Sequence, residues 1–168
     1  VAQGGMGQSL RVLAAVLDEL AQQCASTAMV FMMHNAGVNC YLSDTVKFDA
    51  VLRQAVAGKH LSTLAFSEKG SRSQFWAPVS RAVDSGNGVT LSAEKSWVTS
   101  AGYADGIVSS CVAADASGAS VYLVQKDDAG LAICGGWKSL GMRGNQSNPV
   151  TLTNVALSGD RLIGAAGK

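Results

Sequence analysis

Two segments of this chain predict its fold most strongly: Leu64–Ser73, LAFSEKGSRS, and Lys95–Gly102, KSWVTSAG. The first predicts a strand that runs out into a loop of small residues, where hydroxyls and free backbone N–H groups are offered at the end of a sheet. The loop residues that offer these groups are Ser67, Gly70, Ser71 and Ser73. Such a loop suits an anion or the polar edge of a ring.

The second segment carries an indole and a hydroxyl two residues apart. Trp97 and Thr99 are expected on one face of a strand, because strand side chains alternate between faces. A flat apolar ring system could be stacked on the indole and hydrogen-bonded by the hydroxyl at the same time. Together the two segments indicate a flavin site.

At these residues the chain resembles the acyl-CoA dehydrogenase family. Residues 66–74, FSEKGSRSQ, and 95–100, KSWVTS, stand at a fitting spacing where the family's middle domain has motifs like (V/I)TEPGAGSD and KxWITN. Residues 137–144, WKSLGMRG, resemble its KxGxRG loop, and residues 148–164 resemble its closing strand. Residues 4–27 are similar to the end of its N-terminal helical domain, so the resemblance spans nearly the whole chain.

The resemblance implies an FAD site and a role for several residues in it. Ser67 would meet the pyrimidine edge of the flavin, Trp97 would shield one face of the isoalloxazine, and Thr99 would hydrogen-bond near N5. Ser73 would reach the FAD pyrophosphate and border the acyl-CoA. The full set of implied cofactor contacts is Leu64, Ala65, Phe66, Ser67, Gly70, Ser71, Arg72, Ser73, Trp97, Val98 and Thr99.

The chain departs from the family's loop motif at three positions. Lys69 replaces the usual Pro, Arg72 the second Gly, and Gln74 the Asp. A glycine in a phosphate loop permits close backbone approach, which a side chain at Arg72 forfeits. Either the Arg72 charge pairs with a phosphate of FAD or CoA, or it points to solvent.

Other residues have plainer interpretations. We expect Phe75, Trp76 and Trp137 to be packing residues, and Arg143 to hold its glycine loop through backbone carbonyls. His34 and Asn35 interrupt an apolar helix. They form either a satisfied buried pair or part of the border of an acyl pocket.

The catalytic base of the family is a Glu on a C-terminal helical bundle, and we match no residue of this chain to it. Glu68 corresponds to a family Glu that is structural, and Glu19 and Glu94 lie on the scaffolding of other motifs. We therefore predict no catalytic residue here, and a fragment that is inactive by itself. The whole protein would remove the proton α to a thioester while hydride leaves the β-carbon for flavin N5.

Alternatives to the dehydrogenase remain open at the level of sequence. One is a flavin-dependent monooxygenase of the same architecture, and another is a non-catalytic subunit that binds flavin or CoA. For the dehydrogenase, the resemblance implies an acyl-CoA substrate, an electron-transfer flavoprotein as electron acceptor, and a homo-oligomer, a tetramer or dimer, when complete.

Hydrophobic periodicity predicts an α+β fold. Three helices are expected: one from Ser9 to Cys24, one capped by Ser26 or Thr27, and one from about residue 43 to Gly58 with Val46 and Val56 facing inward. After His60 come short β-rich runs, which predict an antiparallel barrel or sandwich of about eight strands. These runs are residues 61–67, 75–83, 88–94, 96–100, 106–114, 120–125, 131–134 and 149–157, with hairpin turns at 85–88 and 115–118. We divide the chain into residues 1–60, the end of a helical domain, and 61–168, the flavin-binding middle domain.

Composition bounds the function. With 48% hydrophobic and 15% charged residues the chain has ample material for a core, and a net charge of +1 without a basic run argues against nucleic acid. We find no signal peptide and no apolar run of membrane-spanning length, and expect a soluble, cytoplasmic protein. The four cysteines, Cys24, Cys40, Cys111 and Cys134, have no metal-ligand spacing and are expected to be buried, reduced thiols, so no metal site is predicted. The Asn145–Ser147 sequon carries little weight without a secretory signal.

Overall fold

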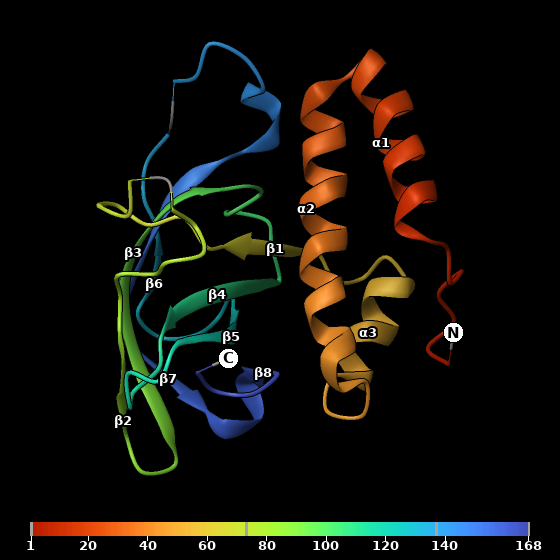
Figure 1. The fold of residues 1–168 in the computed structure, drawn as a ribbon. Coiled ribbons are helices and arrows are strands. Elements are labelled where there is room, and N and C mark those ends of the chain that lie inside the picture. The colour runs from red at the N-terminus through yellow and green to blue at the C-terminus, as the bar shows by residue number, and fades with distance from the viewer. Residues whose placement is uncertain (1, 73, 137, 168) are drawn as a thin grey trace.

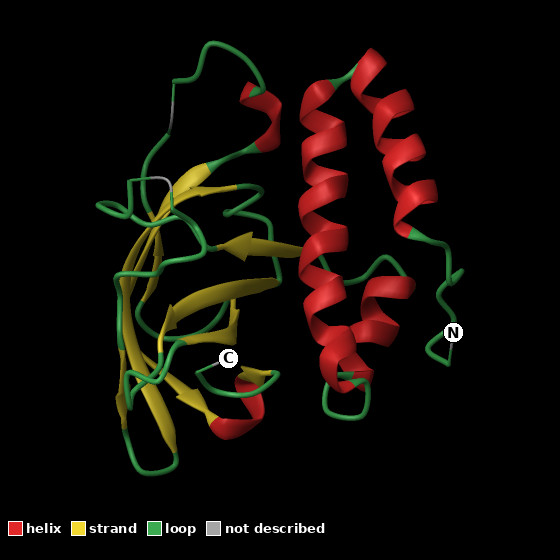
Figure 2. Cartoon of the chain, in the orientation of Figure 1, coloured by secondary structure: helices red, strands yellow, loops and turns green. Residues whose placement is uncertain are grey.

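The computed structural model describes residues 2–72, 74–136 and 138–167, and it consists of a helical layer against a β-sandwich (Figure 1). In the described part of the chain the helices are α1 (Leu10–Gln23), α2 (Ala25–Tyr41) and α3 (Asp49–Val56). The strands are β1 (Ser62–Ala65), β2 (Ala82–Asp84), β3 (Gly88–Val98), β4 (Gly106–Val112), β5 (Ala119–Gln125), β6 (Leu131–Ile133), β7 (Asn148–Ser158) and β8 (Leu162–Ile163). Helices α1 to α3 precede the described strands in the sequence, and Figure 2 shows them set apart from the strands, which confirms the α+β prediction.

The helices confirm the periodicity, but their ends differ from the prediction. Helix α2 begins after Cys24 rather than at a Ser26 or Thr27 cap, and α3 begins after Phe48, following a 3-10 turn at Leu42–Asp44. Val46 lies before α3 and is 88% exposed, so its predicted inward position is wrong. Val56 is also exposed, whereas Gly58 stops α3 in a left-handed conformation, at φ 69°, as predicted.

Helix α2 lies between α1 and the sheet that contains β1 (Figure 1). This central position explains why its sequence is apolar on nearly every side. Gly37 permits the close approach, since a Cβ at this position would lie 2.7 Å from the Cβ of Ser62. At the end of α2, Tyr41 packs with Phe48, Val108 and further sandwich residues in one buried cluster.

The strands form two four-stranded sheets, ordered β1-β4-β5-β8 and β2-β3-β7-β6. Strands β1 and β4 are parallel, and the other described pairs of neighbours are antiparallel. The inner faces enclose a core that includes Leu91, Val98 and Val155, each 0% exposed. No closed barrel is formed by the described residues, so of the two predicted architectures the sandwich holds.

Individual strands correct the sequence prediction. Residues 88–94 and 96–100 were expected as two strands, but they lie largely on one long strand, β3. Of the run 75–83 only the end is in a strand, β2, and the short β8 was not anticipated. Both hairpin turns are confirmed: Ser85 N–H donates to the carbonyl of Gly88 at 3.1 Å, and Ala113 N–H to that of Gly118 at 2.8 Å.

Two expectations about burial are wrong. Phe75 and Trp76 are 53% and 67% exposed and contact each other edge to face, at 5.0 Å between ring centroids, in place of packing in the core. Trp137 lies outside the described residues. Cys24 is exposed, whereas Cys111 is buried and burial raises the pKa of its thiol to about 11.

Within the described ranges no helix has both the length and the apolar character to cross a membrane.

Candidate functional site

Three chain segments meet at one edge of the sandwich: the loop after β1, the end of β3 and the start of β7. Ser96 N–H donates to the carbonyl of Ser67 at 2.8 Å, and Glu68 and Lys95 form an antiparallel bridge. On the other side of β3, Val98 is paired with Asn148. The two motifs that are about thirty residues apart in sequence are therefore side by side, as a shared site requires.

The residues before the loop are committed to packing. Ala65 is 1% exposed and belongs to the sandwich core, whereas Leu64 and Phe66 pack against the cluster beneath the helices. Their side chains are used in packing, so only their backbone N–H and carbonyl groups remain for contact with a ligand. Ser67, the next residue, is half-buried.

The loop itself is shaped by its own hydrogen bonds. The Ser71 side chain is buried, and its Oγ–H donates to the carbonyl of Glu68 at 2.9 Å, so this hydroxyl holds the loop. Gly70 and Arg72 are exposed, both with positive φ, at 92° and 52°. Position 72 thus has the left-handed backbone that a glycine adopts without strain, although an arginine occupies it. Ser73 lies outside the described residues.

The end of β3 differs from the sequence expectation. Trp97 has φ 60° within an irregular part of the β3–β7 register and is 53% exposed. Thr99 follows the strand in a turn and is 3% exposed. Because the backbone is not extended at Trp97, the indole and the hydroxyl do not share one regular strand face, and that prediction is wrong. Val98, between them, is fully buried in the core.

The hydroxyl of Thr99 lies 3.2 Å from that of Ser147, a neighbour that sequence reasoning missed. Ser147 is part of the turn before β7, where Ser100 N–H donates to the carbonyl of Asn145 at 2.9 Å. Asn145 is 5% exposed, and its Oδ1 accepts the N–H of Ser147 at 2.9 Å. The buried asparagine leaves no room for a glycan at the sequon. The only sequence signal for this contact was the polar run around the glycine loop.

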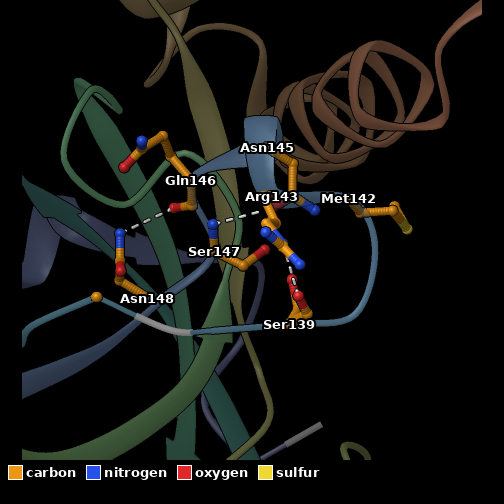
Figure 3. A pocket seen from close by; sticks show the side chains of 8 residues that line it. Ser139, Met142, Arg143, Asn145, Gln146, Ser147 and Asn148 are labelled. Atoms are coloured by element: carbon orange, nitrogen blue, oxygen red, sulfur yellow. Dashed lines mark hydrogen bonds between the residues drawn. The ribbon is translucent and has the colours of Figure 1, made fainter.

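A polar pocket of about 100 Å³ lies beside this turn (Figure 3). Arg143 Nε donates to the carbonyl of Ser139 at 2.8 Å, which confirms its predicted role in holding the loop. Met142 and Gln146 both have positive φ, at 57° and 51°, and they turn the chain around the pocket. The pocket walls are Gly136, Ser139, Met142, Arg143, Asn145, Gln146, Ser147 and Asn148.

Beneath the loop, Glu68 and Lys95 form a buried ion pair with 2.5 Å between Oε1 and Nζ. Burial alone would raise the pKa of the Glu68 carboxyl, but the hydrogen bonds from Lys95 and Ser80 outweigh it and hold this pKa below its usual range. Lys95 Nζ also donates to the carbonyl of Ser110 on β4. The structural role predicted for Glu68 is confirmed, and a carboxylate held by these partners is a poor candidate for a catalytic base.

His34 and Asn35 on α2 make hydrogen bonds outside the three segments that meet at this edge. His34 Nδ1 accepts the N–H of Ser62 at 3.1 Å and so ties α2 to β1, and burial lowers the pKa of this histidine. Asn35 donates to the carbonyl of Phe31 at 2.8 Å within its own helix. Both side chains are hydrogen-bonded, as expected for a satisfied pair, although they are half-buried. Their place at the border of an acyl pocket stays a prediction. Among the residues that the structure describes, no cluster of His, Cys, Asp and Glu could hold a metal ion.

Comparison with known proteins identifies a family with the same sequence features. The sequence model of the family "Acyl-CoA dehydrogenase, middle domain" matches residues 63–155. The short/branched chain specific acyl-CoA dehydrogenase of Bos taurus is 30% identical over 98% of this chain and 39% of its own length. The cyclohex-1-ene-1-carbonyl-CoA dehydrogenase of Geobacter metallireducens is 28% identical over 99% of this chain and 45% of its own length.

A solved structure shares both layers. The FMN-bound TdsC from Paenibacillus sp. A11-2 is 25% identical, with a TM-score of 0.83 over 99% of this chain and 43% of that protein. The chain thus spans less than half the length of the relatives it matches. By the match over residues 63–155 the chain belongs to the acyl-CoA dehydrogenase family.

Proposed function

We propose that the full-length protein is an FAD-dependent oxidoreductase that dehydrogenates the CH–CH bond α,β to the thioester of an acyl-CoA. The observation that carries this proposal is the meeting of Ser67 and Trp97–Thr99 at one edge of the sandwich, in a chain of this family. In this proposal residues 1–60 end a helical domain and residues 61–168 form the flavin-binding middle domain.

The side chains at this edge suit a flavin. Trp97 presents a half-exposed indole to cover an apolar ring face, and Ser67 and Thr99 supply hydroxyls for a polar ring edge. Thr99 is covered by its neighbours, and its hydroxyl lies within hydrogen-bond distance of the Ser147 hydroxyl, with either group able to donate. When bound, the flavin supplies the redox chemistry by accepting the hydride that leaves the β-carbon.

The exposed end of the loop suits the phosphates. Gly70 and Arg72 lie at the surface with left-handed backbones, next to the buried Ser71. A guanidinium at this place can pair with a phosphate of FAD or CoA, which compensates for the close approach that a glycine would allow. Ser73 is proposed as a contact of both the pyrophosphate and the acyl-CoA, by resemblance alone.

The proton acceptor lies elsewhere in this proposal. Glu68, the acidic residue nearest the site in sequence, accepts hydrogen bonds from Lys95 and from the backbone of Val79 and Ser80. We therefore propose that the full-length protein supplies the base from outside these residues, and that this chain alone does not turn over. An electron-transfer flavoprotein as acceptor, a dimeric or tetrameric assembly and a cytoplasmic location complete the proposal.

The test is to purify the full-length protein and identify the flavin that it releases by chromatography and mass. FAD, together with reduction of an artificial electron acceptor by a panel of acyl-CoAs, is the expected result. Protein that carries no flavin after saturation with FAD or FMN would overturn the flavin site. Bound flavin without turnover of any acyl-CoA would overturn the dehydrogenase.

A second candidate is a flavin-dependent monooxygenase of the same architecture. The likeness to FMN-bound TdsC favours a flavin other than FAD, and Lys69, Arg72 and Gln74 depart from the dehydrogenase motif at the same loop. Release of FMN, with oxygen uptake by the reduced holoprotein and no acyl-CoA oxidation, would support this candidate. Bound flavin with neither activity would instead favour a binding subunit.

A further inference from the structure

Glu68 lies at the start of the loop formed by residues 69–78. At this end the backbone is tied to β3, since Glu68 bridges to Lys95 and the Lys69 N–H donates to the carbonyl of Glu94 at 3.0 Å. Its side chain reaches the end of the loop, where Oε2 accepts the N–H groups of Val79 at 2.8 Å and Ser80 at 2.7 Å. A single carboxylate oxygen therefore closes the loop at its base.

The other oxygen of the carboxylate joins the closed loop to the sandwich. Oε1 accepts hydrogen bonds from Ser80 Oγ and Lys95 Nζ, both at 2.5 Å. Lys95 Nζ also donates to the carbonyl of Ser110, so that β3 and β4 are held by the same group. The side chains of Lys95 and Glu68 are 0% and 2% exposed, and water does not compete for these bonds.

The loop that is closed in this way carries the proposed phosphate contacts. Ser71 is bonded to the carbonyl of Glu68, while Gly70 and Arg72 are held at the surface. Fixing the base of a loop reduces the conformations that its tip can adopt, and less entropy is then lost when a ligand is bound. Glu68 is thus placed to act on a ligand through the loop, without touching the ligand.

We propose that Glu68 is a positioning residue: its acceptor oxygen closes the base of the 69–78 loop and so sets the affinity of the site for flavin. The effect on flavin affinity rests on the proposed flavin function. The closure of the loop does not, and it can be measured without any ligand.

The experiment compares two double variants of the full-length protein that differ only in the acceptor. Glu68→Gln/Lys95→Met removes both buried charges but leaves a carbonyl oxygen for the two N–H groups. Glu68→Leu/Lys95→Met removes the charges and the oxygen. Replacing a buried ion pair by neutral side chains of similar size is well tolerated, so both variants are expected to fold.

Trypsin reports on the loop, since Lys69 and Arg72 are exposed within it. Cleavage after these residues is expected to be at least tenfold faster in the Leu/Met variant than in the Gln/Met variant, which should stay within about threefold of the wild type. Cleavage after Lys59, an exposed site outside the loop, is the internal reference and should not change. Equal loop cleavage in the two double variants would overturn the closure.

Flavin titration tests whether closure of the loop sets the affinity of the site for flavin. The dissociation constant is expected to rise at least tenfold in the Leu/Met variant relative to the Gln/Met variant, with an altered fine structure of the flavin absorption band. Leu52→Ala, which removes a buried side chain of the helical layer, lowers stability without touching the loop and should leave the dissociation constant of the folded protein unchanged.

The outcomes separate the two proposals. If trypsin cleaves the loop faster in the Leu/Met variant but both double variants bind flavin equally well, the positioning role is overturned. A wild-type protein that binds no flavin would overturn the proposed function, while the trypsin comparison would still decide whether Glu68 closes the loop.

Discussion

The two layers of the molecule bury their side chains very differently. The sandwich encloses its own core, in which Leu91, Val98 and Val155 are each 0% exposed. Helix α1, all of whose residues are described, has no fully buried side chain, and its Leu10 is 73% exposed. An apolar cavity of about 580 Å³ is lined by residues of α1, α2 and α3 and of the segment before α1.

The difference indicates that stability and the candidate site belong to the same layer. The helical layer packs on the sandwich through a cluster that joins Tyr41, Phe48 and Leu52 to strand residues. The candidate site is built from strand ends and their loops. Changes inside the sandwich should therefore affect both folding and flavin, whereas changes on α1 should affect neither strongly.

The largest effect is expected from Lys95→Met. This variant leaves the Glu68 carboxylate buried without its cation, which typically costs about 3–5 kcal/mol of folding free energy. Urea unfolding followed by circular dichroism measures the loss. The matched control is Lys69→Met, because the Lys69–Glu94 pair is exposed and should contribute less than about 1 kcal/mol. A similar loss in both variants would contradict the contrast.

The next effect compares the layers directly. Leu91→Ala opens a cavity in the sandwich core and should cost about 2–5 kcal/mol. Leu10→Ala on α1 should stay within about 0.5 kcal/mol, because that side chain is mostly in water. The same unfolding curves test both, and comparable losses would mean that α1 is covered by another part of the protein.

Trp97→Ala should act on flavin more than on folding. Stacking of a base on an aromatic side chain is worth about 1–3 kcal/mol, and the half-exposed indole has little core packing to lose. Flavin affinity of the full-length protein is the measurement. Trp76→Ala is the comparison, since Trp76 is more exposed and is not a proposed flavin contact, and this variant should lower affinity much less than Trp97→Ala. If Trp76→Ala abolished binding and Trp97→Ala did not, the site assignment would be wrong.

The smallest effect concerns pH at the interface between the layers. Burial lowers the pKa values of His34 and His60 from 6.5, so the unfolded chain takes up these protons at higher pH than the folded chain. The stabilisation is therefore complete above about pH 6.5 and declines as pH falls below it. Asp105, which faces His60 and is paired with Lys126, has a pKa lowered from 3.8 and titrates below this range.

The free energy of unfolding measured between pH 7 and pH 5 tests this dependence. The wild type should lose stability over this range, and a His34→Gln/His60→Gln variant should lose less. A steeper decline in the variant would show that other groups dominate the titration.

The sequence alone predicted most of the elements and the two motifs of the candidate site. Helical periodicity predicted α1 to α3, Gly58 marked the end of α3, and the turns at 85–88 and 115–118 were recognised from their Gly, Asn and Asp residues. These features depend on neighbours in the chain, and local backbone preferences are enough to predict them. The motif at Lys95–Thr99 was likewise recognised from the sequence, together with the number of residues that separates it from Ser67.

Only the tertiary structure decided which groups meet. The partners Glu68 and Lys95 are 27 residues apart, Thr99 and Ser147 are 48 apart, and His34 and Ser62 are 28 apart. The left-handed backbone at Trp97 and the exposure of Trp76 depend on the same arrangement. Contacts of this kind follow from how the sheets stack and where loops return, and a sequence pattern fixes neither, because periodicity records which face is buried but not what lies against it.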